Sequence, residues 1–128
     1  MPEIRFEEIS PIGDTDAMDL PVPDLEAALP FYIQHLGMTA GPMEAGPPRS
    51  VTLTRDGVSI RLAENGGDPH NSSCYIGVSD VQAIRQSLAE AGQDISEERI
   101  DDQPSGHYRV FFVRAPDGLC FCIGTKEP

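Results

Sequence analysis

The residues that could bind a metal or act as nucleophiles are few and scattered. His35, His70 and His107 include no pair two or four residues apart, the spacing that puts two imidazoles on one face of a strand or helix. Cys120 and Cys122 are two residues apart, so they share one face of a strand and could offer two soft metal ligands. The Cys122 thiol could also act as a nucleophile, but no histidine has a clear position as its base. A surface or packing role is favoured for each of these side chains.

The charge balance excludes several kinds of partner. Nine basic residues stand against 21 acidic ones, which gives a net charge of −12 at pH 7. Binding to nucleic acids or to anionic membranes depends on Lys and Arg, so we expect neither partner. The negative field permits a cationic partner, although a solvated acidic surface is the simpler interpretation.

Length and patterning predict a single cytoplasmic domain. A chain of 128 residues is long enough for one hydrophobic core. No apolar run reaches the ~18 residues of a membrane helix, and the opening MPEIRFEEIS has acids where a signal peptide has Lys or Arg. Cys74, Cys120 and Cys122 lack the even number and spacing of a disulfide framework. We therefore expect reduced thiols in the cytoplasm.

The chain divides into two similar halves. Each has a helical segment followed by apolar strands around an Asp-Gly turn: VPDLEAALPFYIQHLG with VTLTRDGVSIRLAE, then VSDVQAIRQSLAEAG with VFFVRAPDGLCFCIG. Such a repeat indicates one supersecondary unit used twice. The polar stretch ENGGDP separates the halves. We predict one module over about residues 14–64, a linker over about 65–71 and a second module over about 72–125.

The first predicted helix begins after Asp24, its N-cap, and ends at Gly37. Pro30 removes a backbone donor inside it, which predicts a kink or a tight first turn rather than a break. The apolar stripe at helical spacing comprises Leu25, Ala28, Leu29, Tyr32, Ile33 and Leu36.

The second predicted helix begins near Ser79 or Asp80 and ends at Gly92. Its buried face comprises Val81, Ile84, Leu88 and Ala91.

The predicted strands show alternating apolar and polar residues. Asp56-Gly57 lies between two such segments and is a strong hairpin signal, and Asp117-Gly118 is a second one. The segment 110–113 is apolar on both faces, which predicts an inner strand. The alternating apolar positions of the first hairpin are Val51, Leu53, Val58, Ile60 and Leu62.

Several short motifs, taken in order, resemble one family. They are Val22-Pro23-Asp24-Leu25, Phe31-Tyr32, Leu36-Gly37-Met38, the approach 106–111 and the closing turn Ala115-Pro116-Asp117-Gly118. Together they cover about residues 14–125 and resemble the vicinal oxygen chelate superfamily, also called the glyoxalase, bleomycin-resistance and dioxygenase superfamily. The resemblance implies an α+β fold in which two βαβββ modules form a curved mixed sheet, an incomplete barrel around a cup, with the helices outside. It also implies a small-molecule ligand and a homodimer, with the cup inside one chain or between two.

The same resemblance implies four metal-ligand positions, where enzymes of the family carry His or Glu. In this sequence they fall on Ala17, Arg61, Ser73 and Cys122. Alanine has no donor atom, serine is a poor ligand and arginine is a permanent cation, so we expect no metal and no other cofactor. A slip of one residue would bring Asp16 to the first position.

The resemblance further implies which side chains point into the cup. Arg61 could fork onto a ligand carboxylate, phosphate or sulfate, or form an internal pair with Asp19. Tyr75 could stack on a ligand or pack in the core, and His107 with Tyr108 could line the rim. The expected ligand-binding residues are Arg61, Ser73, Tyr75, Cys122, Asp19, Ser59 and Cys120.

The leading hypothesis is a metal-free small-molecule binding protein that sequesters a drug or metabolite without transforming it. With no Trp and 6% aromatic residues, the surface for stacking planar rings is thin, so a bleomycin-type drug is not assigned. One alternative is a metal-dependent lyase, isomerase or dioxygenase. Another is a regulatory subunit whose cup is vestigial.

Overall fold

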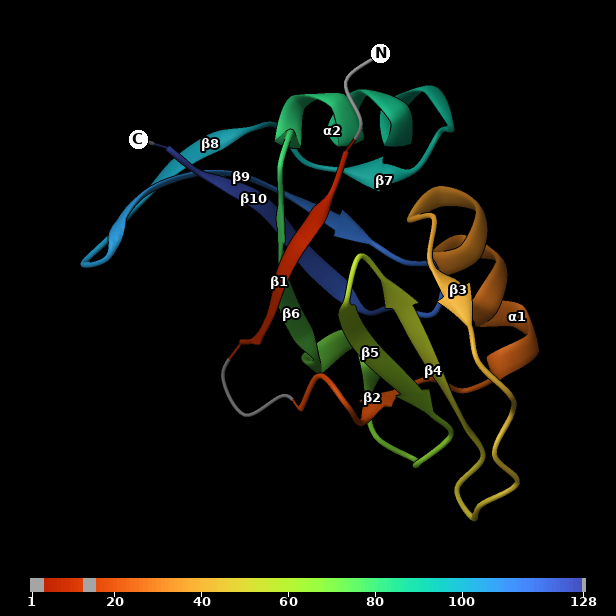
Figure 1. The fold of residues 1–128 in the computed structure, drawn as a ribbon. Helices are drawn as coiled ribbons and strands as arrows, with labels where there is room; N and C mark the ends of the chain where they lie inside the picture. The colour runs from red at the N-terminus through yellow and green to blue at the C-terminus, as the bar shows by residue number, and fades with distance from the viewer. Residues whose placement is uncertain (1–3, 13–15, 128) are drawn as a thin grey trace.

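The computed structural model describes residues 4–12 and 16–127 as two open sheets with helices on their outer sides (Figure 1). We call them the large sheet and the small sheet. The large sheet has the order β1-β6-β10-β9-β7, and β8 also pairs with β9; the small sheet has the order β2-β5-β4-β3. The strands of the large sheet are β1 (Phe6–Pro11), β6 (Ser73–Val78), β7 (Asp94–Ile95), β8 (Arg99–Gln103), β9 (Gly106–Arg114) and β10 (Cys120–Glu127). Those of the small sheet are β2 (Leu20–Pro21), β3 (Thr39–Ala40), β4 (Ser50–Arg55) and β5 (Val58–Ala63).

The two sheets share one topology, which confirms the predicted fold class. In each half the first strand runs parallel to the last, β2 beside β5 and β6 beside β10. The order β6-β10-β9-β7 therefore repeats the order β2-β5-β4-β3. Both Asp-Gly turns join antiparallel neighbours, β4 to β5 and β9 to β10. Asp56 and Gly57 have φ values of +52° and +84°, the left-handed backbone that favours Asp-Gly in a two-residue hairpin.

The first helix changes its winding at Pro30, where a kink was predicted. α1 (Leu25–Pro30) continues as a π-helical turn, η1 (Phe31–His35). The N–H of Leu36 donates to the carbonyl of Phe31, five residues back, at 3.3 Å. This wider turn rotates the end of the stripe, so the prediction for Ile33 was wrong: its side chain is 43% exposed.

The second helix, α2 (Val81–Glu90), begins at its predicted N-cap, Asp80, whose side chain accepts the N–H of Ala83 at 3.1 Å. Val81, Ile84 and Leu88 are buried as predicted. Ala91 was wrongly predicted to be buried, because it caps the helix end and faces solvent. Neither helix in the described part of the chain is long and apolar enough to cross a membrane.

Two features of the N-terminal region differ from the sequence prediction. β1 was not predicted; it pairs antiparallel with β6 and extends the large sheet. The opening strand of the first module was predicted to include Ala17, but this residue lies in a turn and β2 starts only at Leu20. The Asp16 side chain accepts the N–H of Met18 at 2.9 Å and the Asp16 carbonyl accepts the N–H of Asp19 at 3.0 Å, and these local bonds form the turn.

The core fills the space between the helices and the two sheets. Tyr32 joins the halves: its ring packs edge-on against Phe121 of β10, with centroids 5.7 Å apart. Its hydroxyl donates to Asp117 Oδ2 at 2.8 Å, in the turn before β10. The largest fully buried side chains are Tyr32, Phe111, Phe121, Leu20, Leu25, Leu36, Leu53, Ile60, Leu62, Ile76, Leu88 and Leu119.

Candidate functional site

A cavity of about 470 Å³ opens on the face of the large sheet that points away from the core. Side chains alternate along a strand, so burial of Cys74 and Ile76 on one face of β6 puts Tyr75 on the other. Tyr75 is the register partner of Cys122, which in turn pairs with Phe112, and this row across three strands forms the floor. The lining residues are Glu8, Ser10, Ile12, Tyr75, Asp101, Gln103, Ser105, Tyr108, Val110, Phe112 and Cys122.

The strands at the two edges of the large sheet form the walls of this cavity. β1 contributes Glu8 and Ser10 on one side, and Ile12 follows directly after this strand. On the other side β8 contributes Asp101 and Gln103, and the β8–β9 hairpin projects from the body of the molecule (Figure 1). The walls therefore come from elements that flank the repeated strands of the second module.

The next pair of residues on this face of β6 and β10 consists of two glycines. Gly77 pairs with Gly124, and a Cβ at Gly124 would lie 3.2 Å from the Tyr75 ring. The Tyr75 ring packs edge-on to Tyr108, with centroids 6.0 Å apart and planes at 85°. The Tyr108 hydroxyl lies 3.1 Å from Ser105 Oγ. The absence of side chains at Gly77 and Gly124 thus gives the Tyr75 ring the room that it occupies.

Burial and nearby carboxylates raise the pKa values of the thiol and phenol groups around the floor. Burial raises the pKa of the Cys122 thiol to about 11, and the Asp101 carboxylate adds to that rise. Burial and the Glu8 carboxylate likewise hold the pKa of Tyr75 well above its ordinary value. Burial raises the pKa values of Cys120 and of Cys74 as well. Protonated thiols are poor nucleophiles and poor metal ligands at neutral pH.

The structure brings together two of the seven expected ligand-binding residues, Tyr75 and Cys122. Ser73 and Cys120 are register partners on the same two strands but do not line the cavity. The carboxylate of Asp19 lies 3.2 Å from Asn65 Nδ2, in a loop.

Ser59 and Arg61 lie on β5, in the other sheet. Asp19 precedes β2, the strand paired with β5, yet the alternative of an internal Arg61–Asp19 pair is not formed among the described residues: the Asp19 carboxylate contacts Asn65 instead. Within the described residues, Arg61 Nε is buried and has no hydrogen-bond partner.

The four positions that the family resemblance assigns to a metal fall on separate elements. Ala17 and Arg61 meet through their backbones, with Arg61 N–H donating to the Ala17 carbonyl at 3.0 Å. Ser73 and Cys122 lie on β6 and β10 of the large sheet. A carboxylate or imidazole occupies none of these positions, so this residue set does not fit a divalent metal.

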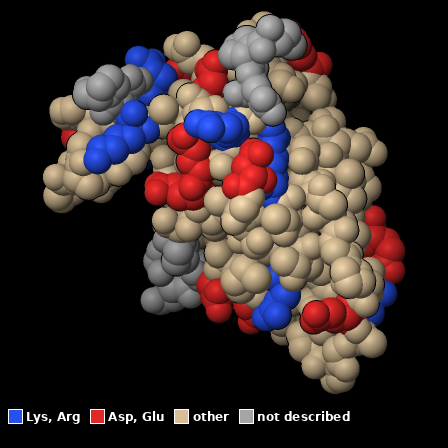
Figure 2. Space-filling view, viewed as in Figure 1, with Lys and Arg blue, Asp and Glu red and all other residues tan. Residues whose placement is uncertain are grey.

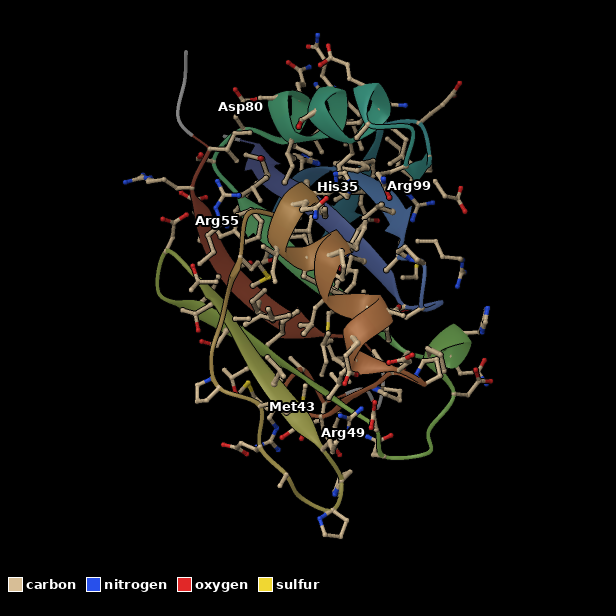
Figure 3. All side chains as sticks on the ribbon, turned by 90° about the vertical axis from the view of Figure 1, so that its right-hand side faces the viewer. His35, Met43, Arg49, Arg55, Asp80 and Arg99 are labelled. Atoms are coloured by element: carbon tan, nitrogen blue, oxygen red, sulfur yellow. The ribbon has the colours of Figure 1, made fainter. Side chains whose placement is uncertain are left out.

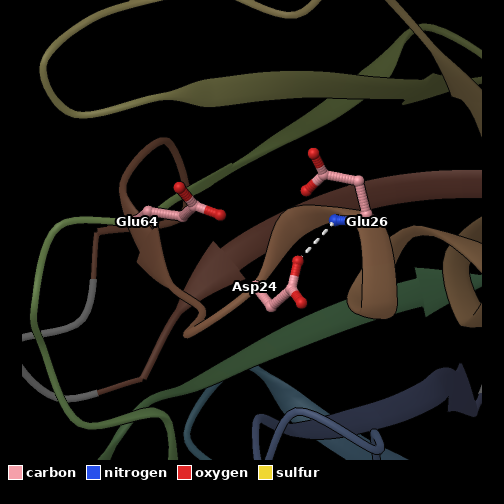
Figure 4. A group of neighbouring side chains, drawn as sticks. All are labelled: Asp24, Glu26 and Glu64. Atoms are coloured by element: carbon pink, nitrogen blue, oxygen red, sulfur yellow. Dashed lines mark hydrogen bonds between the residues drawn. The ribbon is translucent and has the colours of Figure 1, made fainter.

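One acidic group elsewhere has the spacing of a metal site: Asp24, Glu26 and Glu64, whose ligand atoms lie within 4.8 Å of one another (Figure 4). The guanidinium of Arg49 already pairs with two of these three carboxylates. Arg49 donates to both oxygens of Glu64, at 2.8 and 2.7 Å, and to both oxygens of Glu26, at 2.9 and 3.0 Å. The hydrogen bonds from Arg49 lower the pKa of Glu64 to about 2. This cluster is an ion-pair network that fastens α1 to the start of β4.

The histidines add no ligands to that cluster. Figure 3 places His35 and Arg49 at opposite ends of the α1–η1 helix. His70 lies in a single 3-10 turn, η2 (Pro69–Asn71), near Asp68. His107 bonds to Asp102 across the β8–β9 hairpin.

Sequence reasoning missed most of the cavity. Glu8 and Ser10 belong to the unpredicted β1 and Ile12 follows it, and Asp101, Gln103 and Ser105 belong to the β8–β9 hairpin. The turn Gln103-Pro104-Ser105-Gly106 between two strand-like segments was a usable signal for that hairpin. β1 had no comparable signal, because its partner strand lies more than 60 residues away.

The fold defines the class of protein: two open sheets built on one β-α-β pattern, helices outside, and a ligand-sized cavity on the concave side of one sheet. The family model described as "Glyoxalase/Bleomycin resistance protein/Dioxygenase superfamily" matches residues 14–123. The chain belongs to this superfamily.

Solved structures share the fold at low sequence identity. TnmS3, an antibiotic binding protein from Streptomyces sp. CB03234, superimposes with a TM-score of 0.73, at 22% identity and over 91% of this chain and 98% of that one. A bleomycin-binding protein from Streptomyces verticillus, complexed with copper(II)-bleomycin, gives a TM-score of 0.68 at 20% identity, with 91% and 98% covered. The bleomycin resistance determinant encoded on the transposon Tn5 gives 0.69 at 21% identity, with 91% and 100% covered. No curated protein sequence matches significantly.

Proposed function

We propose that the protein binds a small organic molecule in the large-sheet cavity and holds it without chemical change and without a metal. The observation that carries this proposal is the cavity itself. Its volume of about 470 Å³ falls in the range of small-molecule sites, roughly 300–1,000 Å³. Its lining combines phenol and phenyl rings with a few hydroxyl, amide and carboxylate groups, which orient a ligand.

The lining favours binding over catalysis. Its one thiol, Cys122, has a pKa of about 11 and is therefore protonated at neutral pH. No histidine lines the cavity among the described residues, so the side chain that most often acts as a general acid or base is absent from that lining. Superfamily relatives of the same fold are described as antibiotic-binding and bleomycin-binding proteins, which supports a sequestering role.

A binding experiment on two matched variants tests this function. A fragment library of small aromatic molecules would be screened by two-dimensional ¹H–¹⁵N NMR on the intact protein. Phe112→Ala removes a ring that lines the cavity, and Ile100→Ala removes an exposed side chain of the neighbouring strand. Fragments should shift the amides of Tyr75 and Phe112, lose affinity in Phe112→Ala and keep it in Ile100→Ala. Equal losses in the two variants would contradict the assigned site.

Metal analysis tests the metal-free state. Protein purified without chelator or affinity-tag metals would be measured before and after incubation with Zn²⁺, Ni²⁺, Mn²⁺ and Fe²⁺. We expect a metal content near zero in each case. A stoichiometry near one per chain, or one per two chains, would contradict the proposal and favour an enzyme.

We also infer a homodimer in the cytoplasm. The three cysteines are free thiols, which supports a reducing compartment. The Arg61 side chain is half-buried and forms no ion pair among the described residues, and a carboxylate of a second copy of the chain could pair with its guanidinium. Light scattering over a concentration series should then give twice the chain mass, and Arg61→Met should weaken the association. A wild-type protein that stays monomeric at high concentration would contradict this inference.

A further inference from the structure

The charged side chains that line the large-sheet cavity are both acids. Glu8 lies on the β1 wall and Asp101 on the β8 wall, and no Lys, Arg or His lines the cavity among the described residues. The outer surface differs: over the upper part of β1 the acidic side chains lie next to Lys or Arg side chains (Figure 2), and Glu7 pairs with Arg5 at 3.9 Å. The cavity itself is bounded by carboxylates on two opposite sides.

Neither carboxylate is neutralised by a cation within the described residues. Glu8 forms no hydrogen bond or ion pair there. Asp101 Oδ2 accepts a hydrogen bond from Gln103 Nε2 at 2.8 Å, but that donor carries no charge. Two negative charges thus remain uncompensated at the cavity walls, and enclosure by low-dielectric walls focuses their field.

The fields of both acids reach the floor. Glu8 contributes to the raised pKa of Tyr75 and Asp101 contributes to the raised pKa of Cys122, and these two residues are register partners on adjacent strands. Two cations lie near the lining: the Arg99 guanidinium is 5.1 Å from the centroid of the Phe112 ring, and Lys126 lines an adjoining hollow together with Glu8 and Tyr75. Among the described residues neither cation forms an ion pair with Glu8 or Asp101. At the Cys122 thiol, Asp101 raises the pKa by more than Arg99 lowers it.

The aromatic rings of the lining complement this field. Tyr75 and Tyr108 meet edge to face, a geometry that leaves ring surface open toward the cavity. Aromatic faces attract cations through their quadrupole and also pack against apolar groups. The same surface therefore suits both a positive group and the hydrocarbon body that carries it.

From this arrangement we propose that the ligand is an organic cation, a protonated amine attached to an aromatic or apolar body. The ammonium group is held by the cavity carboxylates, with Glu8 the stronger contributor because it has no competing hydrogen bond, and the body packs on Tyr75, Tyr108 and Phe112. This inference rests on the proposed binding function of the same cavity. It goes further because it states the charge of the ligand and the residues that bind the charged group.

Three probes of one shape and different charge test the inference on the intact protein. They are 2-phenylethylammonium, 2-phenylethanol and 3-phenylpropanoate, titrated at pH 7 and followed by the amide shifts of Tyr75 and Phe112. The cation should bind about tenfold more tightly than the alcohol, and the carboxylate should bind most weakly. Raising the salt from 50 to 500 mM should weaken the cation and leave the alcohol unchanged.

Charge-removing variants locate the effect. Glu8→Gln and Asp101→Asn should each weaken the cation by about threefold to tenfold and leave the alcohol unchanged. The matched control is Glu97→Gln, which removes an exposed charge outside the cavity. Equal affinity for cation and alcohol, or a preference for the carboxylate, overturns the cationic assignment while the binding function stands. If none of the three probes shifts the cavity amides, both proposals fail.

Discussion

The two sheets are built on one plan, yet their concave faces differ. The large sheet presents rings and carboxylates around a cavity, and its paired glycines, Gly77 and Gly124, make room for the Tyr75 ring. On the small sheet Thr54 and Ser59 meet through their hydroxyls at 3.1 Å, and Arg61 lies beside them on β5. The backbone repeat therefore does not decide where a ligand binds; that depends on the side chains of one face and on the strands added at its edges.

The two sheets also differ in the contacts that attach them to the first helix. The small sheet is tied to α1 by the Arg49 network at the surface. The large sheet is tied to the first helix by a buried contact, Tyr32 to Asp117. A solvent-screened ion pair contributes little to stability, whereas a buried hydrogen bond is costly to break.

The largest expected effect compares two neighbouring rings of β9. Phe111 is fully buried on the core side, and Phe112 lines the cavity on the other. Phe111→Ala should lower the free energy of unfolding by about 3–5 kcal/mol, and Phe112→Ala by about 1 kcal/mol or less. Urea denaturation measures both. Equal losses would show that the cavity is closed and packed in solution.

The glycine row should respond unequally to a methyl group. A Cβ at Gly124 would lie 2.6 Å from Val110 Cγ1 and 2.9 Å from the Arg109 carbonyl, whereas one at Gly77 would lie 2.7 Å from Glu8 Cγ, a side chain that can move. Gly124→Ala should therefore destabilise by about 1–3 kcal/mol, and Gly77→Ala by less. Thermal denaturation of the two variants tests the difference. A larger loss in Gly77→Ala would contradict the described packing of Glu8.

The contact between the halves should depend on a single hydroxyl. Tyr32→Phe leaves the partly buried Asp117 carboxylate with the N–H of Leu119 as its remaining described donor. We expect a loss of about 1–3 kcal/mol at pH 7. Denaturation of the wild type and Tyr32→Phe in parallel measures it, and an unchanged stability would mean that the bond is absent in solution.

The pH dependence of this contact has a definite sign. Burial raises the pKa of Asp117 above its ordinary value of 3.8, so folding favours its protonated form. This carboxyl group therefore makes the protein less stable as the pH rises from 3.8 through its folded pKa. The stability of Asp117→Asn relative to wild type should increase over that interval. A relative stability that falls over the interval would contradict the burial of this group.

The smallest effect is expected at the Arg49 network. The pKa of Glu64 is lowered from 4.5 to about 2, so its stabilising contribution is present above pH 4.5 and lost as the pH falls toward 2. Glu64→Gln should be slightly less stable than wild type at pH 7 and equal to it near pH 2. High salt should also reduce the difference. Chemical denaturation at three pH values checks this, and a difference that persists at low pH would contradict the ion-pair origin.

Local chemistry accounts for the parts of the fold that could be predicted. The N-caps Asp24 and Asp80 and the two Asp-Gly turns act over two to four residues, and the structure confirms all of them. The inner strand over residues 110–113 is also confirmed, since β9 lies between β10 and its partners β7 and β8. The errors at Ile33 and Ala91 came from assuming ideal helical winding up to the helix ends.

Most of the residues that line the cavity could not be predicted from such local patterns. Tyr75 and Cys122 were expected at a ligand site because the family resemblance puts Cys122 at a cup position and strand alternation puts Tyr75 on the same face as Ser73, another such position. Glu8 and Asp101 were not, because their place depends on pairings of β1 with β6 and of β8 with β9. A free strand edge accepts any strand of compatible register, and the sequence near Glu8 does not state which edge it joins.

The sequence by itself thus determined the two-module α+β plan, its caps and hairpins, and the loss of the metal-binding residue types, because these follow from residue identity and near-neighbour spacing. The tertiary structure alone decided that the cavity belongs to the large sheet, that acids form its walls and that Arg61 lies on the other sheet. These outcomes depend on which distant strands pair, and the free energy of that choice is spread over contacts between residues far apart in the chain.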